Sequence, residues 1–277
     1  MIAALLIAFR EGLEAALIVG IVLSFLNKIG QSAYRLYVWI GVGAAVLASI
    51  VLAVAIQIVG AELEGTAEQL FEGTAMLLAV VVLTWMIFWM RYQSRTIKSS
   101  LEQEVQDVVR QERKWGLVAV TFLAVFREGV ETALFLSAAA FATDALSTLL
   151  GTAIGLGLAV GVGYLIYAST VRLNMQRFFQ VTSLLLLVFA AGLFAHGVHE
   201  LQEAGIIPVI IEHVWNINPV LDENSTVGQI LKTLVGYNGN PSLLEVVAYL
   251  GYWVFVFFGV RWWVDRRVNR ALMPAGA

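Results

Sequence analysis

The chain has 277 residues, of which 60% are hydrophobic and only 13% charged, and its mean hydropathy is +0.82. Soluble domains carry roughly 25% charged residues, so this composition excludes an ordinary soluble protein. The formal net charge of −3 argues against nucleic acid as a partner, and the absence of cysteine excludes disulfides and thiolate metal sites.

Seven apolar stretches are long enough to cross a bilayer as helices, which takes about 20 residues each. They are 2–26, 36–59, 70–90, 116–140, 147–168, 178–199 and 244–263. We therefore predict an all-α, polytopic membrane protein with seven transmembrane helices and a single membrane domain over residues 1–277. The first stretch lacks the basic start of a signal peptide, so we expect it to be retained as a working helix.

The distribution of basic residues predicts the orientation. If the seven spans alternate, every Lys and Arg outside the spans lies on one side, except Lys232. The positive-inside rule then gives a multi-pass protein of the inner (plasma) membrane, with its N-terminus out and its C-terminus in. The predicted outer segments are acidic. They could steer cations to the outer mouth, or they could simply lack selection for basic residues.

One charged motif occurs twice in the middle of these apolar stretches. Residues 9–17 read F-R-E-G-L-E-A-A-L, and residues 126–134 read F-R-E-G-V-E-T-A-L. Ionisable groups at bilayer depth cost roughly 2.5–3.5 kcal/mol each on insertion scales, and they mark ion pathways and relays. On a helix the two glutamates of each copy share one face, and the arginine can pair with the glutamate four positions later. The predicted metal ligands are Glu11, Glu14, Glu128 and Glu131, beside Arg10 and Arg127.

An oxygen-rich group of four carboxylates suits a hard cation. The glycine between the glutamates, Gly12 or Gly129, could let a second helix or an ion come close. The structural alternative is a pair of buried salt bridges that fix the helix packing. Buried ion pairs stabilise poorly once desolvation is counted, so a duplicated six-charge cluster favours a cation pathway.

The chain also looks duplicated around this motif. G-V-G-A-A-V at 41–46 resembles G-L-G-L-A-V at 155–160, and F-E-G-T-A-M-L-L at 71–78 resembles F-Q-V-T-S-L-L-L at 179–186. We predict an inverted 3+3 repeat, because each unit holds an odd number of spans. The predicted parts are repeat 1 at about 1–91, a cytoplasmic linker at 92–114, repeat 2 at about 115–200, an outer loop at 201–243 and a seventh helix at 244–263.

Two further groups could extend the path to the outer side. The acids at the start of the third span could form a funnel, or they could be ordinary acids at a helix N-terminus. The segment H-G-V-H-E at 196–200 could contact metal, or it could be a solvated histidine pair. The residues in question are Glu64, Glu68, Glu72, His196, His199 and Glu200.

The doubled R-E-G-x-E, together with L-F-E-G at 70–73 and H-G-V-H-E-L at 196–201, resembles the oxidase-dependent iron permeases. These include the bacterial EfeU type and the fungal high-affinity iron permease. The resemblance implies uptake of iron with the motif glutamates as ligands, and Fe(III) supplied by a partner that oxidises ferrous iron outside. Iron would be the transported substrate, and no permanently bound cofactor is expected. The sequence has no cupredoxin, haem or cysteine signature, so a separate iron-oxidising or iron-delivering partner protein is implied.

Other functions stay open at this point. A transporter of another cation, such as Fe(II) or lead, or a carrier coupled to protons could use the same carboxylates. An intramembrane di-metal enzyme would normally add Glu-x-x-His pairs, and the motif stretches contain no histidine. A sensor or assembly subunit would bind metal without moving it. We predict a permease in contact with membrane lipid, and not an enzyme.

Overall fold

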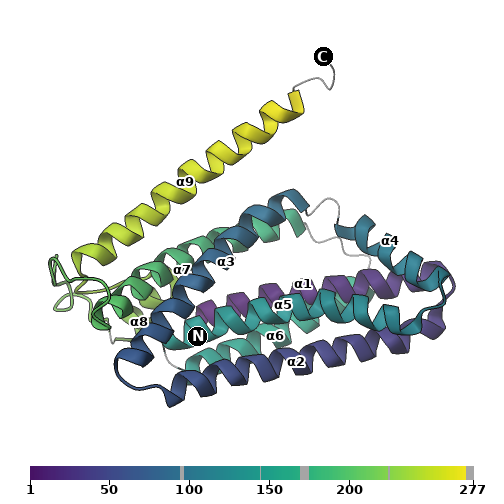
Figure 1. Ribbon diagram of the computed structural model, residues 1–277, viewed down its shortest axis with the longest axis horizontal. Coiled ribbons are helices and arrows are strands. Elements are labelled where there is room, and N and C mark those ends of the chain that lie inside the picture. The colour runs from purple at the N-terminus through teal and green to yellow at the C-terminus, as the bar shows by residue number, and fades with distance from the viewer. Residues whose placement is uncertain (94–96, 144, 169–174, 224, 273–277) are drawn as a thin grey trace.

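The computed structural model describes residues 1–277 except 94–96, 144, 169–174, 224 and 273–277 (Figure 1). The described residues form helices and no strand, as predicted. The helices are α1 (Ile2–Lys28), α2 (Arg35–Glu62), α3 (Thr66–Gln93), α4 (Ile97–Arg110), α5 (Lys114–Ala142), α6 (Ala145–Ala168), α7 (Met175–Glu203), α8 (Thr226–Val235) and α9 (Leu243–Leu272), with a 3₁₀ turn at Ser32–Tyr34.

Four helical segments of the described chain are long and apolar enough to cross a membrane: Ser32–Glu62, Thr66–Trp89, Ala145–Leu165 and Phe178–Glu203. The helices α1 and α5 have similar lengths, 27 and 29 residues, but each carries three charged residues near its middle. The apolar part of α9, Leu243–Gly259, is shorter. The total of seven spans therefore stays a prediction, while a membrane-embedded helical bundle agrees with these segments.

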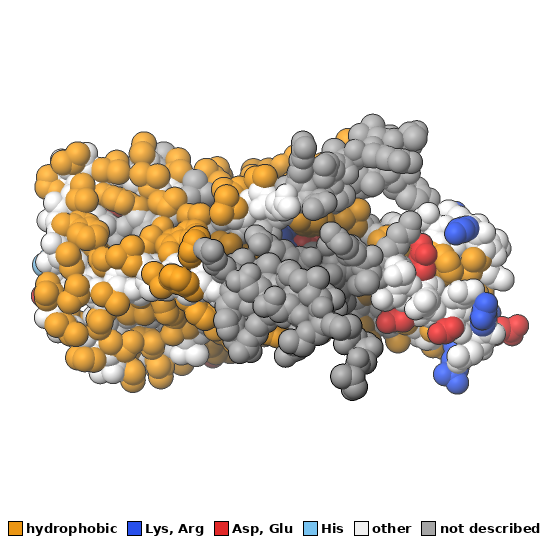
Figure 2. Space-filling model, turned by 90° about the horizontal axis from the view of Figure 1, so that it is seen from above, with side chains coloured by type: hydrophobic (Ala, Val, Ile, Leu, Met, Phe, Trp, Pro, Cys, Tyr) orange, Lys and Arg blue, Asp and Glu red, His pale blue; other side chains and the backbone are white. Residues whose placement is uncertain are grey.

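The surface supports this placement. Large apolar side chains such as Leu47, Val51 and Val160 are exposed along α2 and α6. In Figure 2, hydrophobic side chains dominate the described surface of one half, and acidic and basic side chains gather at the opposite end. An apolar belt with charges at its end is what a bilayer requires of a helical bundle.

The helices pair across the two predicted repeats. The most extensive packing joins α1 to α6, α2 to α5, and α3 to α7. In Figure 1, α1 and α5 run in opposite directions, and so do α3 and α7. An exchange of partners of this kind is what an inverted repeat would produce; the repeat itself stays a prediction.

Two hydrophobic clusters lie along α1 and α5, one on each side of the motifs. The α3/α7 cluster includes Ile7 and Phe135 and continues into α3, α7 and α9. The α2/α4 cluster includes Val22 and Leu117 and continues into α2 and α4. The charged residues of both motifs therefore lie between two layers of apolar side chains.

The described part of the predicted 92–114 linker contains a helix, α4. Its buried side chains, Leu101 and Val105, belong to the α2/α4 cluster, while Glu104 and Asp107 are exposed. At the other end of the bundle, Ser225 caps the N-terminus of α8, and its side chain accepts a hydrogen bond from Gly228 N. This end also holds the turn between α2 and α3 (Figure 1).

Candidate metal centre

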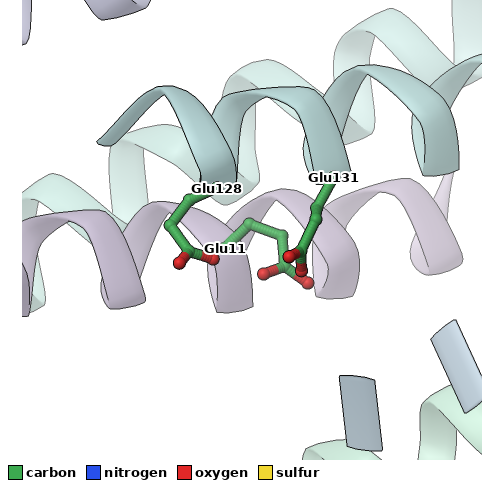
Figure 3. A group of neighbouring side chains, drawn as sticks. All are labelled: Glu11, Glu128 and Glu131. Carbon is green, nitrogen blue, oxygen red and sulfur yellow. The ribbon is translucent and has the colours of Figure 1, made fainter. Parts of the chain in front are cut away.

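Three glutamates from the two motifs meet in the interior of the bundle. Glu11 on α1 points toward Glu128 and Glu131 on α5 (Figure 3), and one carboxylate oxygen from each lies within 4.8 Å of the others. All three residues are buried. Oxygens on opposite sides of a cation held at 2.3–2.6 Å lie about 5 Å apart, so this spacing fits a cation bound between the three.

One oxygen of each of these carboxylates lacks a hydrogen-bond partner among the described residues. Glu11 Oε2, Glu128 Oε2 and Glu131 Oε2 are buried and accept no hydrogen bond from the residues that the structure describes. Buried acceptors without partners cost free energy, and each one calls for an explanation. A cation would satisfy these oxygens and would relieve the repulsion among the three carboxylates.

The fourth predicted ligand, Glu14, is held differently. Arg10 is completely buried, and its Nη1 lies 2.5 Å from Glu11 Oε1 and its Nη2 2.9 Å from Glu14 Oε1. Arg10 Nη1 also donates to Met86 Sδ at 3.2 Å. Glu14 therefore pairs with Arg10 at the edge of the site, outside the group of three carboxylates.

The second motif arginine lies at the rim of the site. Arg127 Nε is 3.1 Å from Glu131 Oε1 and 3.9 Å from Glu128 Oε1. Its guanidinium carbon lies 4.5 Å from the centre of the Trp89 ring, a cation–π distance. The Arg127 side chain is 41% exposed. Met86 and Trp89, three positions apart on α3, thus contact the two arginines, one each.

The two motif glycines allow close helix contacts. A Cβ added at Gly12 would lie 2.9 Å from Ala159 Cβ on α6. One added at Gly129 would lie 2.6 Å from Ser49 Cβ on α2 and would collide with Ser49 Oγ. Each motif helix therefore meets the second helix of the other predicted repeat at its glycine.

The predicted acidic residues of the outer path do not belong to the three-carboxylate group. Glu72 interacts electrostatically with Glu68 and Glu200, because α3 and α7 cross closely at Gly73 and Gly197. Glu64 is exposed in the turn between α2 and α3.

The histidines on α7 belong to a different feature. His199 Nδ1 lies 3.1 Å from Glu245 Oε1 and its Nε2 3.1 Å from Glu203 Oε1, while His196 Nε2 is 3.6 Å from Glu200 Oε1. Both histidines line a cavity of about 270 Å³ that His213 and Glu245 also line.

Sequence reasoning missed several residues of these sites. Met86 and Trp89 look like ordinary apolar residues of a membrane helix, so nothing in the pattern singles them out. His213 and Glu245 lie far from the H-G-V-H-E segment in the sequence. The one available signal was that the chain contains only three histidines.

The sequence was compared with known proteins. The profile of the "Iron permease FTR1 family" matches residues 1–268. The chain is 39% identical over 249 residues to the "Ferrous iron permease EfeU" of Escherichia coli O6:K15:H31 (strain 536 / UPEC), which covers 89% of this chain and 90% of that protein. It is 36% identical over 249 residues to the "Ferrous iron permease EfeU" of Yersinia pestis, covering 89% and 88%. No solved structure matches the chain significantly.

These relatives are named as permeases and not as enzymes, and they match nearly the whole chain. The resemblance seen in the doubled motif is thereby confirmed. With its long apolar helices, the chain is an integral membrane protein that belongs to the iron permease FTR1 family.

Proposed function

We propose that the chain moves iron inward across the cytoplasmic membrane through the site formed by Glu11, Glu128 and Glu131. The observation that carries this proposal is the convergence of three buried carboxylates, each with one oxygen that accepts no hydrogen bond from the described residues. Buried carboxylate oxygens that stayed without partners would only weaken the fold. A site that is filled and emptied during transport gives them a use.

Glu14 is the fourth proposed ligand. In the described structure its carboxylate is 2.9 Å from Arg10 Nη2. Ligation by Glu14 therefore requires Arg10 to release it, and the Arg10–Glu11 pair is then the contact that stays. Antiparallel motif helices and the exchange of partners between α1/α6 and α5/α2 support transport by an inverted repeat that alternates access.

The transported form in this proposal is Fe(III), supplied by a separate oxidase on the outer side. The three converging ligands offer only carboxylate oxygen, a hard donor that suits a highly charged cation. The relatives are named for ferrous iron. Ferrous iron would be the external supply, and oxidation would precede entry into the carboxylate site. Direct transport of Fe(II) or of another divalent metal is the alternative.

Uptake of radioactive iron into proteoliposomes tests the proposal. Iron is supplied as Fe(II) under anaerobic conditions and, separately, as chelated Fe(III), to wild type, Glu131→Gln and the control Glu104→Gln. Glu104 is an exposed carboxylate on α4 and lies outside the site. We expect Glu131→Gln to lower uptake at least about 10-fold, and Glu104→Gln to leave it unchanged.

Unchanged uptake in Glu131→Gln would contradict the carboxylate site. Uptake of Fe(II) alone would contradict the ferric form while leaving the site intact. Competition by excess unlabelled Mn(II) or Pb(II) would show whether another divalent metal is preferred.

A further inference from the structure

All three histidines of the chain line one cavity of about 270 Å³ at the end of the bundle that carries α8. His196 and His199 come from α7, and His213 comes from the segment between α7 and α8. The predicted orientation places this end outside. A chance gathering of the only three imidazoles of a 277-residue chain is a poor explanation for this arrangement.

The cavity has a rigid frame. A Cβ added at Gly192 on α7 would lie 2.5 Å from Gly236 Cα, and Gly236 ends α8 with a φ of +69°. Only glycine fits this contact, because it needs both a bare Cα and a left-handed backbone. Elsewhere in the lining, Glu245 Oε1 accepts from Ser242 N at 3.0 Å, and Glu245 Oε2 accepts from Asn238 Nδ2 at 2.7 Å. These contacts hold two parts of the lining in place without a bound ion.

Several polar side chains of this lining have an atom that could coordinate a metal ion. Asn240 lines the cavity, and its buried Oδ1 accepts no hydrogen bond from the described residues. His196 Nε2 has Glu200 only at 3.6 Å, which is too long for a hydrogen bond. Glu223 also lines the cavity, and its Oε2 accepts from Gly239 N at 3.2 Å. Imidazole, amide and carboxylate thus line one cavity. Within the described chain, the group of three His, Asp or Glu donors within 4.8 Å of one another is at the carboxylate site, so a cation bound here would have to draw these donors together.

We propose that this cavity is a second metal site, one that binds a divalent transition-metal cation through imidazole nitrogen and carboxylate or amide oxygen. Imidazole suits Fe, Zn, Cu and Ni, whereas the three-carboxylate site offers oxygen alone. The two sites therefore differ in the cations that they prefer. This inference concerns other side chains than the transport proposal. It is tested by metal binding to the purified protein and not by iron uptake.

Lys232 provides a test of whether the cavity binds a cation or an anion. It lines the same cavity, and it is the only Lys or Arg of the predicted outer segments. Its ammonium opposes a bound cation and would favour a bound anion. A lysine stem is flexible enough to withdraw when a cation enters. Replacing Lys232 should therefore tighten the binding of a cation and weaken the binding of an anion.

The experiment measures Co(II) binding to the purified full chain in detergent, by visible absorption and calorimetry. The background variant Glu11→Gln/Glu131→Gln removes two ligands of the carboxylate site. We expect this variant to bind one Co(II), with the bands of a nitrogen-coordinated ion. Adding His196→Gln/His213→Gln should lower the affinity at least about 10-fold, and Lys232→Gln should raise it several-fold.

Glu212→Gln is the matched control, because Glu212 is an exposed carboxylate next to His213 that does not line the cavity. Absence of Co(II) binding in the background variant, or binding unaffected by the two histidine substitutions, would overturn the proposal. Weaker Co(II) binding by Lys232→Gln than by its parent variant would also overturn the proposal. Tighter binding of citrate by wild type than by Lys232→Gln would show an anion site instead. Loss of iron uptake in Glu131→Gln with Co(II) binding intact would separate the two sites.

Discussion

The two copies of the R-E-G-x-E motif have nearly the same sequence but different surroundings. On α1, Arg10 is fully buried and contacts Glu11, Glu14 and Met86. On α5, Arg127 is 41% exposed and lies over the Trp89 ring while it pairs with Glu131. The duplicated motif thus supplies the same charged groups twice. The side chains packed around each copy determine how deeply its arginine is buried. Arg10 is a buried counter-charge, and Arg127 is a partly exposed counter-charge at the rim.

The largest expected effect separates the two arginines by stability. Arg10→Gln leaves Glu11 and Glu14 buried without their cationic partner, which typically costs about 3–5 kcal/mol. Arg127→Gln also leaves Glu131 buried without its partner, but Arg127 itself is 41% exposed, so water can replace part of this contact and we expect a smaller loss of about 1–3 kcal/mol. Equilibrium unfolding in mild detergent checks this difference. Equal losses in the two variants would show that the burial of Arg10 does not set its role.

The two glycines offer a second way to test the comparison. Gly129→Ala would collide with Ser49 on α2, and Gly12→Ala would press on Ala159 on α6. Overpacking of this kind costs about 1–3 kcal/mol, and we expect Gly129→Ala at the upper end because its contact is the closer. Thermal unfolding of both variants measures the order.

A compensating change tests the cause of the Gly129 effect. Ser49→Gly removes the side chain that the new methyl group would meet, so the double variant Gly129→Ala/Ser49→Gly should recover most of the lost stability. Additive losses in the double variant would show that the α2 contact is not responsible.

The smallest expected effect concerns Trp89. Trp89→Leu removes the cation–π contact with Arg127, worth about 0.5–1 kcal/mol. We expect the apparent KM for iron to change a few-fold with little loss of stability. Trp85→Leu is the matched control, since Trp85 lies one turn earlier on the same helix and is 70% exposed. An equal change of KM in both variants would remove Trp89 from the site.

Much of this site follows from local spacing. The i,i+4 rule predicts the Arg10–Glu14 and Arg127–Glu131 pairs, and both are present, at 2.9 and 3.1 Å. Helical periodicity also puts Glu128 and Glu131 on one face. These features depend only on residues within one turn of a helix, so the sequence determines them.

The remaining features depend on contacts between distant segments. Periodicity cannot say that Glu11 turns to α5 while Glu14 stays with Arg10, because both positions share the inward face. Burial of Arg10 depends on Met86, and exposure of Arg127 depends on what surrounds Trp89. His213 joins His196 only through the path of the segment between α7 and α8. Such contacts are set by the packing of whole helices, which no local pattern encodes.

The placement of the carboxylates between the α3/α7 and α2/α4 clusters has an electrical consequence. Two apolar layers act as insulators, so most of the membrane voltage would drop across them and little across the polar centre. In the predicted orientation, a cation that crosses inward gains about 2.3 kcal/mol per charge for each 100 mV. The side chains that hold the bundle together would thereby let the resting potential drive a multivalent ion inward. The same apolar layers would prevent a leak of protons that would dissipate this potential.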